Sequence, residues 1–176
     1  MRARALIPPG SDILHHVSTL VGQDREHALA AIAQVEAEGR ARTRLNDGCV
    51  PLLQALHSLK VPMAILTRNN QDALEWTLQK FALAQFFPPN LRISRDFPFR
   101  PKPHPDGLLH IAKTCGVHDM KRVLMVGDWT DDIDAGLAAG CDTCLLKYDK
   151  NSHVTNAHIV VDSLGDLAAI LVPPSS

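Results

Sequence analysis

The 176-residue sequence lacks the features that mark several large classes of protein. No cluster of five or more lysines and arginines occurs, and the formal net charge is −1, so we expect no nucleic-acid partner bound through a basic face. No apolar run approaches the roughly 18 residues of a membrane span, and the first residues lack the apolar core of a signal peptide. We therefore expect a cytoplasmic protein that does not enter membranes, while the weakly basic start MRARAL leaves organellar targeting open if the N-terminus is incomplete.

Cysteine is scarce as well, with four residues at positions 49, 115, 141 and 144. No second Cys/His pair stands at zinc-finger spacing, which argues against a structural zinc site. Cys141 and Cys144 have the spacing of a redox motif, but such a motif needs its first cysteine at a helix start, and CDTCLLK is typical of the start of a strand. We interpret both as small residues beside a buried strand.

The length and composition are those of an ordinary globular domain. Hydrophobic residues make up 45% of the chain and charged residues 21%. A chain of this length buries roughly 70% of its unfolded surface on folding, so no disulfide or metal is needed to hold a core. The sequence shows no internal repeat and no low-complexity segment.

Short apolar runs alternate with helical segments of about ten residues from residue 62 onward. This alternation predicts an α/β fold, a Rossmann-like parallel sheet with helices on both faces. The two helices predicted before Asn46 indicate a separate small helical unit, so we divide the chain into a partial cap (1–45), a core (46–172) and a disordered tail (173–176). The predicted strands are 63–67, 91–94, 123–128, 142–147 and 158–163, and the predicted helices are 11–22, 24–42, 50–60, 70–83, 105–116, 131–140 and 163–171.

Three predicted strand ends are unusually polar, and in open parallel sheets the site lies at the carboxyl ends of the strands. The first is MAILTRNN, where Thr67, Arg68 and Asn69 place a hydroxyl and backbone N–H groups at a strand-to-helix junction. Such a junction can cradle a phosphate group. Thr67 could instead be a simple helix cap, which would explain the threonine but not the residues after it.

The second polar stretch is FRPKPHPD, in which Lys102 stands between two prolines that keep its loop extended and stiff. That setting suits a cation that must point in one direction. A solvated loop lysine is the simpler reading of this stretch taken alone.

The third stretch is MVGDWTDDIDAG, which carries four aspartates within seven positions and no lysine or arginine. One or two acidic residues in a first helical turn are explained by the helix dipole. Four such carboxylates repel one another at neutral pH, and a hard divalent cation would relieve the repulsion. We predict Asp128 and Asp132 as the ligand pair for Mg²⁺, with Asp131 and Asp134 facing solvent or capping the helix.

Together, the stretches ILTRN, KPHPD and VGDWTDDIDAGLAAG closely resemble the haloacid dehalogenase superfamily of phosphohydrolases. The resemblance covers about residues 46–172, and the third stretch is its most specific part. It implies that Thr67 binds the phosphoryl oxygens and that Lys102 neutralises the nucleophile and the phosphate. It also implies that Asp128 and Asp132 hold Mg²⁺, and the Gly-Asp opening favours the metal-dependent phosphatase branch.

The same resemblance makes one departure visible. The family begins with a strand that ends in Asp-x-Asp-x-Thr, whose first aspartate is the nucleophile and whose second is the general acid/base. No such sequence occurs here, and neither Asp12 nor Asp24 follows a predicted strand. The helical segment from Ser11 to about Arg44 resembles the small cap that such enzymes insert after this first motif. We therefore expect a chain that starts inside the cap, with Met1 an internal methionine of a longer protein.

The missing strand would lie in the middle of the family's sheet, between the strands that end at Thr67 and at Asp128. Each backbone group left dry and unpaired costs about 1–3 kcal/mol, whereas a domain's whole margin is about 5–15 kcal/mol. Either the two neighbouring strands pair directly, or the fold is strongly destabilised.

Two functions remain open from the sequence. The first is a Mg²⁺-dependent phosphatase of small phosphorylated metabolites, inactive or weak as printed because the nucleophile is absent. The alternative is a non-catalytic domain of the same family, a truncated isoform that binds phosphate or a partner protein. A receiver-type phosphoacceptor domain also gathers acidic residues, threonine and lysine, but there the acid pair comes first along the chain, and here it comes last.

Overall fold

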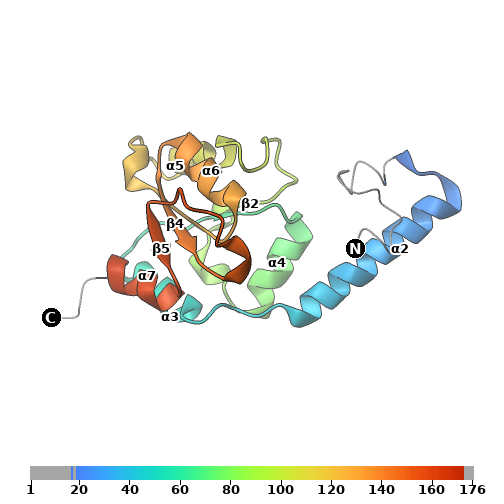
Figure 1. Cartoon of the computed structure of the whole chain (residues 1–176), viewed down its shortest axis with the longest axis horizontal. Helices are drawn as coiled ribbons and strands as arrows, with labels where there is room; N and C mark the ends of the chain where they lie inside the picture. Colours follow the sequence, from blue (N-terminus) through green and yellow to red (C-terminus); the bar gives the residue numbers. More distant parts are fainter. Residues whose placement is uncertain (1–16, 18, 173–176) are drawn as a thin grey trace. The chain divides into compact units, whose positions relative to one another are not determined.

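The computed structural model describes Val17 and residues 19–172, which divide into two compact units at Arg44 and Leu45. In the first unit, α2 (Gly22–Arg42) forms a helix where the sequence predicts one (Figure 1). The helix predicted over 11–22 lies almost entirely outside the described residues, as does the predicted tail at 173–176.

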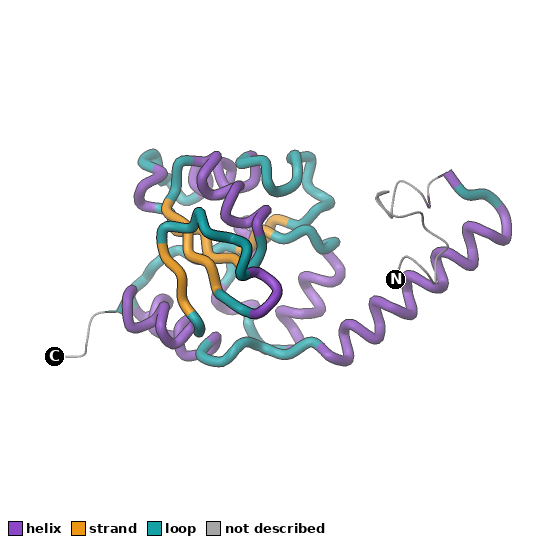
Figure 2. Tube along the Cα trace, viewed as in Figure 1, coloured by secondary structure: helices purple, strands orange, loops and turns teal. Residues whose placement is uncertain are grey.

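All strands of the second unit pair in parallel, as the alternating pattern predicts, and the α/β class is confirmed (Figure 2). They form two sheets, β1–β2 and β3–β4–β5. The ladder of the first sheet extends past its strand, because the Thr67 N–H donates to Ile93 O at 2.9 Å. The strands are β1 (Ile65–Leu66), β2 (Arg92–Ile93), β3 (Leu124–Gly127), β4 (Asp142–Leu146) and β5 (Ile159–Val161).

Helices pack on both faces of this layer. On one face Leu52 of α3 and Leu167 of α7 share a buried cluster with Cys144 of β4. On the other face helices α5 and α6 pack against Met125 of β3. The helices are α3 (Cys49–Ser58), α4 (Gln71–Lys80), α5 (Asp106–Thr114), α6 (Thr130–Ala139) and α7 (Leu164–Leu171), with short 3-10 turns η1 (Ala84–Phe86), η2 (Pro89–Leu91), η3 (Met120–Arg122) and η4 (Asp149–Asn151).

A gap separates the two sheets, because β1 and β3 do not pair with each other within the described residues. Both sheets nevertheless belong to one layer, since Leu56 of α3 packs in a cluster with Ile65 of β1 and in another with Leu124 of β3. On the opposite face, Leu66 of β1 packs in the same cluster as Met125 of β3. The neighbouring strands therefore do not close the gap by direct pairing, and shared helices hold them instead.

The capping residues explain where several helices begin and end. Asn70 caps α4 by accepting a hydrogen bond from the Ala73 N–H at 2.8 Å. Ser163 caps α7 in the same way, accepting from the Asp166 N–H at 3.1 Å, as its sequence predicts. Helix α6 ends at Gly140, whose φ of 80° lies in the left-handed region that glycine tolerates.

The cysteines behave as structural residues. All four thiols are free, and Cys141 and Cys144 are buried beside or within β4. Burial raises the pKa of the Cys144 thiol, and the same cause raises the pKa of Cys141. Neither residue begins a helix, so the interpretation as small residues beside a buried strand is confirmed.

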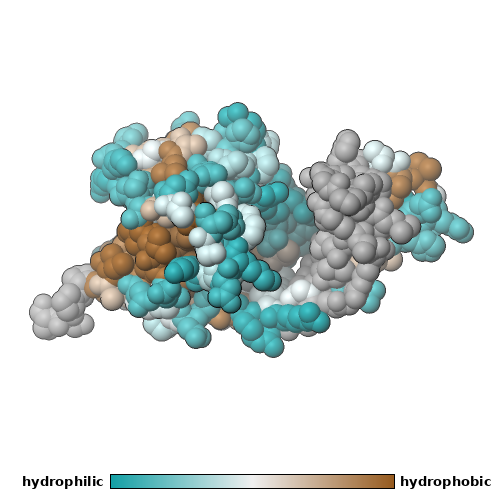
Figure 3. All heavy atoms as spheres, in the orientation of Figure 1, coloured by the Kyte–Doolittle hydropathy of each residue, from teal (hydrophilic) through white to brown (hydrophobic). Residues whose placement is uncertain are grey.

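The surface of the second unit carries an apolar patch over β5 (Figure 3). Val160 of β5 is among the exposed large hydrophobic side chains. None of the described helices is both long and apolar enough to cross a membrane.

Candidate phosphate and metal site

Thr67 lies immediately after β1, and capping does not explain it, because Asn70 caps the following helix. Its Oγ1 accepts a hydrogen bond from the Asn69 N–H at 3.1 Å, which leaves the hydroxyl proton available to donate to a ligand. The Asn69 N–H, which we predicted to take part in a phosphate cradle, is thereby committed to Thr67. The Asn69 carbonyl accepts from the Arg95 N–H at 3.0 Å, so this loop is tied to the segment after β2.

Lys102 is not a solvated loop lysine, since its side chain is only 11% exposed. Its Nζ donates to Leu66 O at 2.9 Å and to Asp132 Oδ1 at 2.5 Å. Leu66 ends β1, and Asp132 stands in the first turn of the helix that follows β3. The ammonium group therefore bridges the two sheets at their carboxyl ends.

Asp132 holds the turn between β3 and α6 in place. Its Oδ2 accepts from the backbone N–H groups of Asp128 and Trp129, both at 3.1 Å, while Oδ1 accepts from Lys102. Gly127 makes room for this arrangement, because a Cβ at position 127 would lie 2.2 Å from the Cβ of Asp132. The capping role that we expected of Asp131 or Asp134 thus falls to Asp132.

The other aspartates of the cluster have separate partners. Asp131 forms an ion pair with Arg68, and Asp134 Oδ1 accepts from Asn156 Nδ2 at 3.0 Å. Two of the four carboxylates are therefore neutralised by cations from elsewhere in the chain, and the repulsion that suggested a metal is largely relieved without one. Asp128 is the exception, since its carboxylate forms no hydrogen bond or ion pair with another described side chain.

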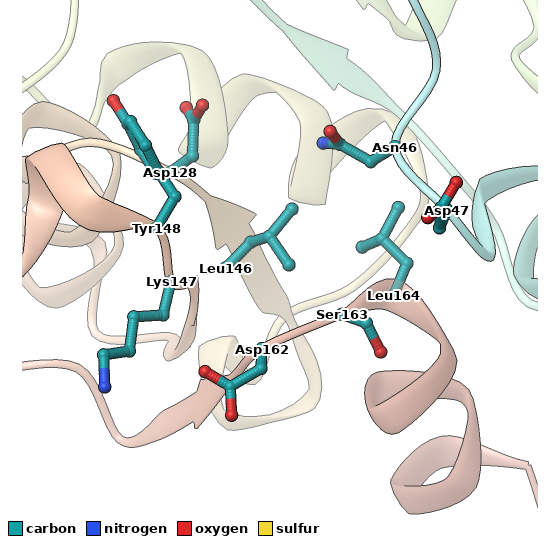
Figure 4. A pocket seen from close by; sticks show the side chains of 9 residues that line it. All are labelled: Asn46, Asp47, Asp128, Leu146, Lys147, Tyr148, Asp162, Ser163 and Leu164. Carbon is teal, nitrogen blue, oxygen red and sulfur yellow. The ribbon is translucent and has the colours of Figure 1, made fainter.

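Asp128 is exposed and lines a pocket of about 440 Å³ (Figure 4). The pocket opens at the carboxyl ends of β3, β4 and β5, where Lys147 follows β4 and Asp162 follows β5. Leu146 and Leu164 supply its apolar wall. Its lining residues are Asn46, Asp47, Asp128, Leu146, Lys147, Tyr148, Asp162, Ser163 and Leu164.

The donor set at this site suits a hard cation that keeps most of its water. In the described part of the chain, no group of three or more His, Cys, Asp or Glu side chains could hold a metal ion. Mg²⁺ commonly uses one or two carboxylates together with waters and a phosphate, and does not need such a group. Asp128 fits that use. Asp132, the other predicted ligand, binds Lys102 and the turn through its two oxygens, and its part in metal binding stays a prediction.

Sequence reasoning missed Asn151, whose side chain is fully buried in η4. Its Nδ2 donates to Asp128 O at 2.9 Å and to Leu146 O at 2.8 Å, and its Oδ1 accepts from the Tyr148 N–H at 2.8 Å. This one amide joins the end of β3 to the loop after β4. An asparagine in a polar loop is too common a feature to have revealed it.

Replacing Asn151 with alanine should lower the free energy of unfolding by about 2–4 kcal/mol, because each buried backbone group left unpaired costs about 1–3 kcal/mol. Urea denaturation followed by circular dichroism measures the change. Asn156→Ala is the control, since that asparagine is exposed and should cost less than about 0.5 kcal/mol. Equal losses in the two variants would contradict the role of Asn151.

Comparison with known proteins identifies the family of the chain. A family model described as haloacid dehalogenase-like hydrolase matches residues 3–140. A haloacid dehalogenase-like hydrolase domain-containing protein of Arabidopsis thaliana is 39% identical over 147 residues, 82% of this chain and 57% of the plant protein. An uncharacterized hydrolase of Saccharomyces cerevisiae is 34% identical over 164 residues, which are 91% of this chain and 74% of the yeast protein.

The phosphoglycolate phosphatase of Escherichia coli K12 is 30% identical over 128 residues, 70% of this chain and 50% of that enzyme. The chain thus spans little more than half the length of the plant relative and half that of the bacterial one. Among solved structures, a predicted phosphoglycolate phosphatase from Haemophilus somnus 129PT matches with a TM-score of 0.75 at 22% identity, over 86% of this chain and 68% of that one. At that identity the match supports the fold alone.

Proposed function

Because the chain belongs to the haloacid dehalogenase-like hydrolase family, we propose that its core binds the phosphate group of a small phosphorylated metabolite between Thr67 and Lys102, beside Mg²⁺ on Asp128. One observation carries the proposal. The buried Lys102 ammonium lies between the end of β1 and the aspartate turn after β3, at the carboxyl edge of the sheet. A parallel sheet places its ligand at that edge.

Each residue has a defined part in this proposal. Lys102 supplies a fixed positive charge, and Thr67 donates its hydroxyl proton to a phosphoryl oxygen. Asp132 orients the ammonium of Lys102 and orders the turn from which the Asp128 carboxylate projects. Mg²⁺, when bound, supplies further positive charge to the phosphoryl oxygens.

The proposal separates binding from turnover. Covalent phosphoryl transfer in the family needs an aspartate nucleophile and a second aspartate as general acid/base, and the 176 residues contain no Asp-x-Asp-x-Thr. The gap between β1 and β3 is the place where a strand carrying those carboxylates would fit. We propose that the residues present bind phosphate and that efficient hydrolysis depends on such a strand. A chain without it acts as a phosphate-binding domain.

The substrate class follows from the site and from the relatives. The phosphate group is held by one lysine, one threonine hydroxyl and one exposed carboxylate with its metal, which suits a small phosphomonoester. Phosphoglycolate is the substrate named by several relatives, and it is the first compound to try with this chain.

Phosphate binding can be measured through the fluorescence of Trp129, which adjoins Asp128 and contacts the His153 ring at a centroid distance of 5.6 Å. A Trp76→Phe background leaves Trp129 as the remaining tryptophan of the two. Inorganic phosphate with Mg²⁺ should change this signal, and Lys102→Gln should weaken binding roughly tenfold or more, because a charged hydrogen-bond donor is lost. Lys121→Gln, which alters an exposed lysine, is the matched control and should bind as the parent does.

Two results would contradict the proposal. The phosphate site would be contradicted if Lys102→Gln bound phosphate as tightly as the parent while keeping the circular dichroism spectrum of the parent. If the 176-residue chain hydrolysed p-nitrophenyl phosphate and Asp128→Ala abolished that activity, the nucleophile would be present after all.

A further inference from the structure

Two neighbouring aspartates at the start of α6 each pair with a cation from a loop, one after β1 and one after β2. Asp132 pairs with Lys102, and Asp131 pairs with Arg68. The two pairs differ in burial, because the Lys102 and Asp132 side chains are 11% and 10% exposed, whereas those of Arg68 and Asp131 are 62% and 26% exposed. The first pair is therefore largely buried, and the second is open to solvent.

The exposed pair, Arg68 and Asp131, is expected to contribute little to the stability of the fold. Exposed ion pairs contribute little to stability, because solvent screens them and both side chains lose freedom. Arg92 shows what a structural arginine looks like in this fold. Its side chain is 12% exposed, and it donates to Phe87 O at 2.8 Å, to Ala84 O at 3.0 Å and to Glu75 at 2.9 Å. Arg68 has no comparable network among the described residues.

Arg68 is also close to the proposed phosphate site. It follows Thr67 directly, on the loop where the phosphate group is proposed to bind, and its guanidinium reaches across to the N-terminal turn of α6. A guanidinium fork binds a carboxylate or a phosphate through two parallel hydrogen bonds, which a lysine cannot do. In this structure one nitrogen of the guanidinium, Nη1, donates to a protein carboxylate, Asp131 Oδ2.

We propose that Arg68 is a specificity-determining residue that binds a second anionic group of the phosphorylated substrate, exchanging Asp131 for it. This inference rests on the proposed phosphate site. It restricts the substrate class to small phosphomonoesters that carry another carboxylate or phosphate a few bonds away. Asp131 competes with that second anion, so the pair makes esters whose phosphate is the only anionic group the weaker ligands.

The test compares three ligands that differ in one group: ethyl phosphate, phosphoglycolate and ethylene glycol bisphosphate. Isothermal titration calorimetry with the 176-residue chain and Mg²⁺ gives the dissociation constants. Phosphoglycolate or the bisphosphate should bind the parent roughly tenfold more tightly than ethyl phosphate, as expected for a charged hydrogen-bonded pair at a partly exposed site. Whichever of these two ligands binds more tightly identifies the second anion as a carboxylate or a phosphate.

Two variants isolate the residues. Arg68→Gln should remove the advantage of the ligands with two anionic groups and change ethyl phosphate binding less than about twofold. Asp131→Asn should strengthen binding of the ligands with two anionic groups a few-fold, because it releases the guanidinium, and should leave ethyl phosphate unchanged. Arg68→Lys should keep only part of the advantage, since lysine lacks the fork.

The outcomes separate the two proposals. If ethyl phosphate binding depends on Lys102 but all three ligands bind equally well, the role of Arg68 is overturned and the phosphate site stands. The role of Arg68 would also be overturned if the ligands with two anionic groups kept their advantage in Arg68→Gln. Absence of ethyl phosphate binding would overturn the phosphate site and this inference together.

Discussion

Replacing Asp132 with alanine should lower the free energy of unfolding by about 3–5 kcal/mol, the usual cost of removing one partner of a buried ion pair. The substitution leaves the Lys102 ammonium without its carboxylate in a nearly buried position. It also leaves the N–H groups of Asp128 and Trp129 without their acceptor. Urea denaturation of the parent and the variant, followed by circular dichroism, measures the difference.

The neighbouring residue supplies a matched control. Asp131→Ala removes a carboxylate one position away, in the same turn of α6, whose partner Arg68 is largely exposed. That change should cost only about 0–1 kcal/mol. Similar losses for the two alanine variants would show that the buried pair is not what stabilises this turn.

The largest effect on activity should come from adding a strand. A chain extended at its N-terminus by a segment that contains an apolar strand ending in Asp-x-Asp-x-Thr should hydrolyse p-nitrophenyl phosphate faster than the 176-residue chain by a factor on the order of 10⁴ or more. The added strand would supply the nucleophile and the general acid/base. It should also raise the urea midpoint, because it pairs with the free edges of β1 and β3.

The control carries the same segment with its first aspartate changed to asparagine. This chain should show the gain in stability without the gain in turnover, because the backbone pairs as before and the nucleophile is gone. An extended chain that is no more stable than the parent would mean that the gap between the sheets does not accept a strand. Equal turnover with aspartate and asparagine would place the nucleophile elsewhere.

Much of the fold could be predicted because the pattern is local. The order of strands and helices from residue 62 onward follows from apolar runs that alternate with helical segments, and each predicted core strand is present, although every one is shorter than predicted. The proximity of Lys102 to Asp132 could also be expected, since the carboxyl ends of parallel strands meet at one edge. The family resemblance, taken from three short stretches, is confirmed by the match over residues 3–140.

The partners of individual side chains could not be predicted, because they depend on contacts between segments distant in sequence. The aspartate stretch contains no basic residue, which suggested an unbalanced cluster, yet Arg68 and Lys102 from two other loops pair with its members. Which aspartate caps the turn depends on the space that Gly127 leaves for Asp132, a feature of three-dimensional packing. Nothing in the sequence around Asn151 indicated its three hydrogen bonds to backbone groups, which only the structure shows.

The absence of an Asp-x-Asp-x-Thr motif was visible in the sequence, but the arrangement of the strands without it was not. We expected either direct pairing of the flanking strands or strong destabilisation, and among the described residues the first does not occur. Leu56, shared by two buried clusters, shows how one helix can keep both sheets in a single layer. Our expectation considered only the backbone hydrogen bonds between strands, and it left out the packing of helices on the faces of the sheets.

The two unpaired strand edges on either side of the gap also bear on how the protein behaves in concentrated solution. Natural sheets protect such edges with charges, prolines or covering loops, because a bare edge is a template for strands of other molecules. Within the described residues, the edges of β1 and β3 that face the gap have no paired strand, and their residues include the half-exposed Val126. Where these edges are uncovered, we expect molecules to associate through backbone pairing and to separate on dilution.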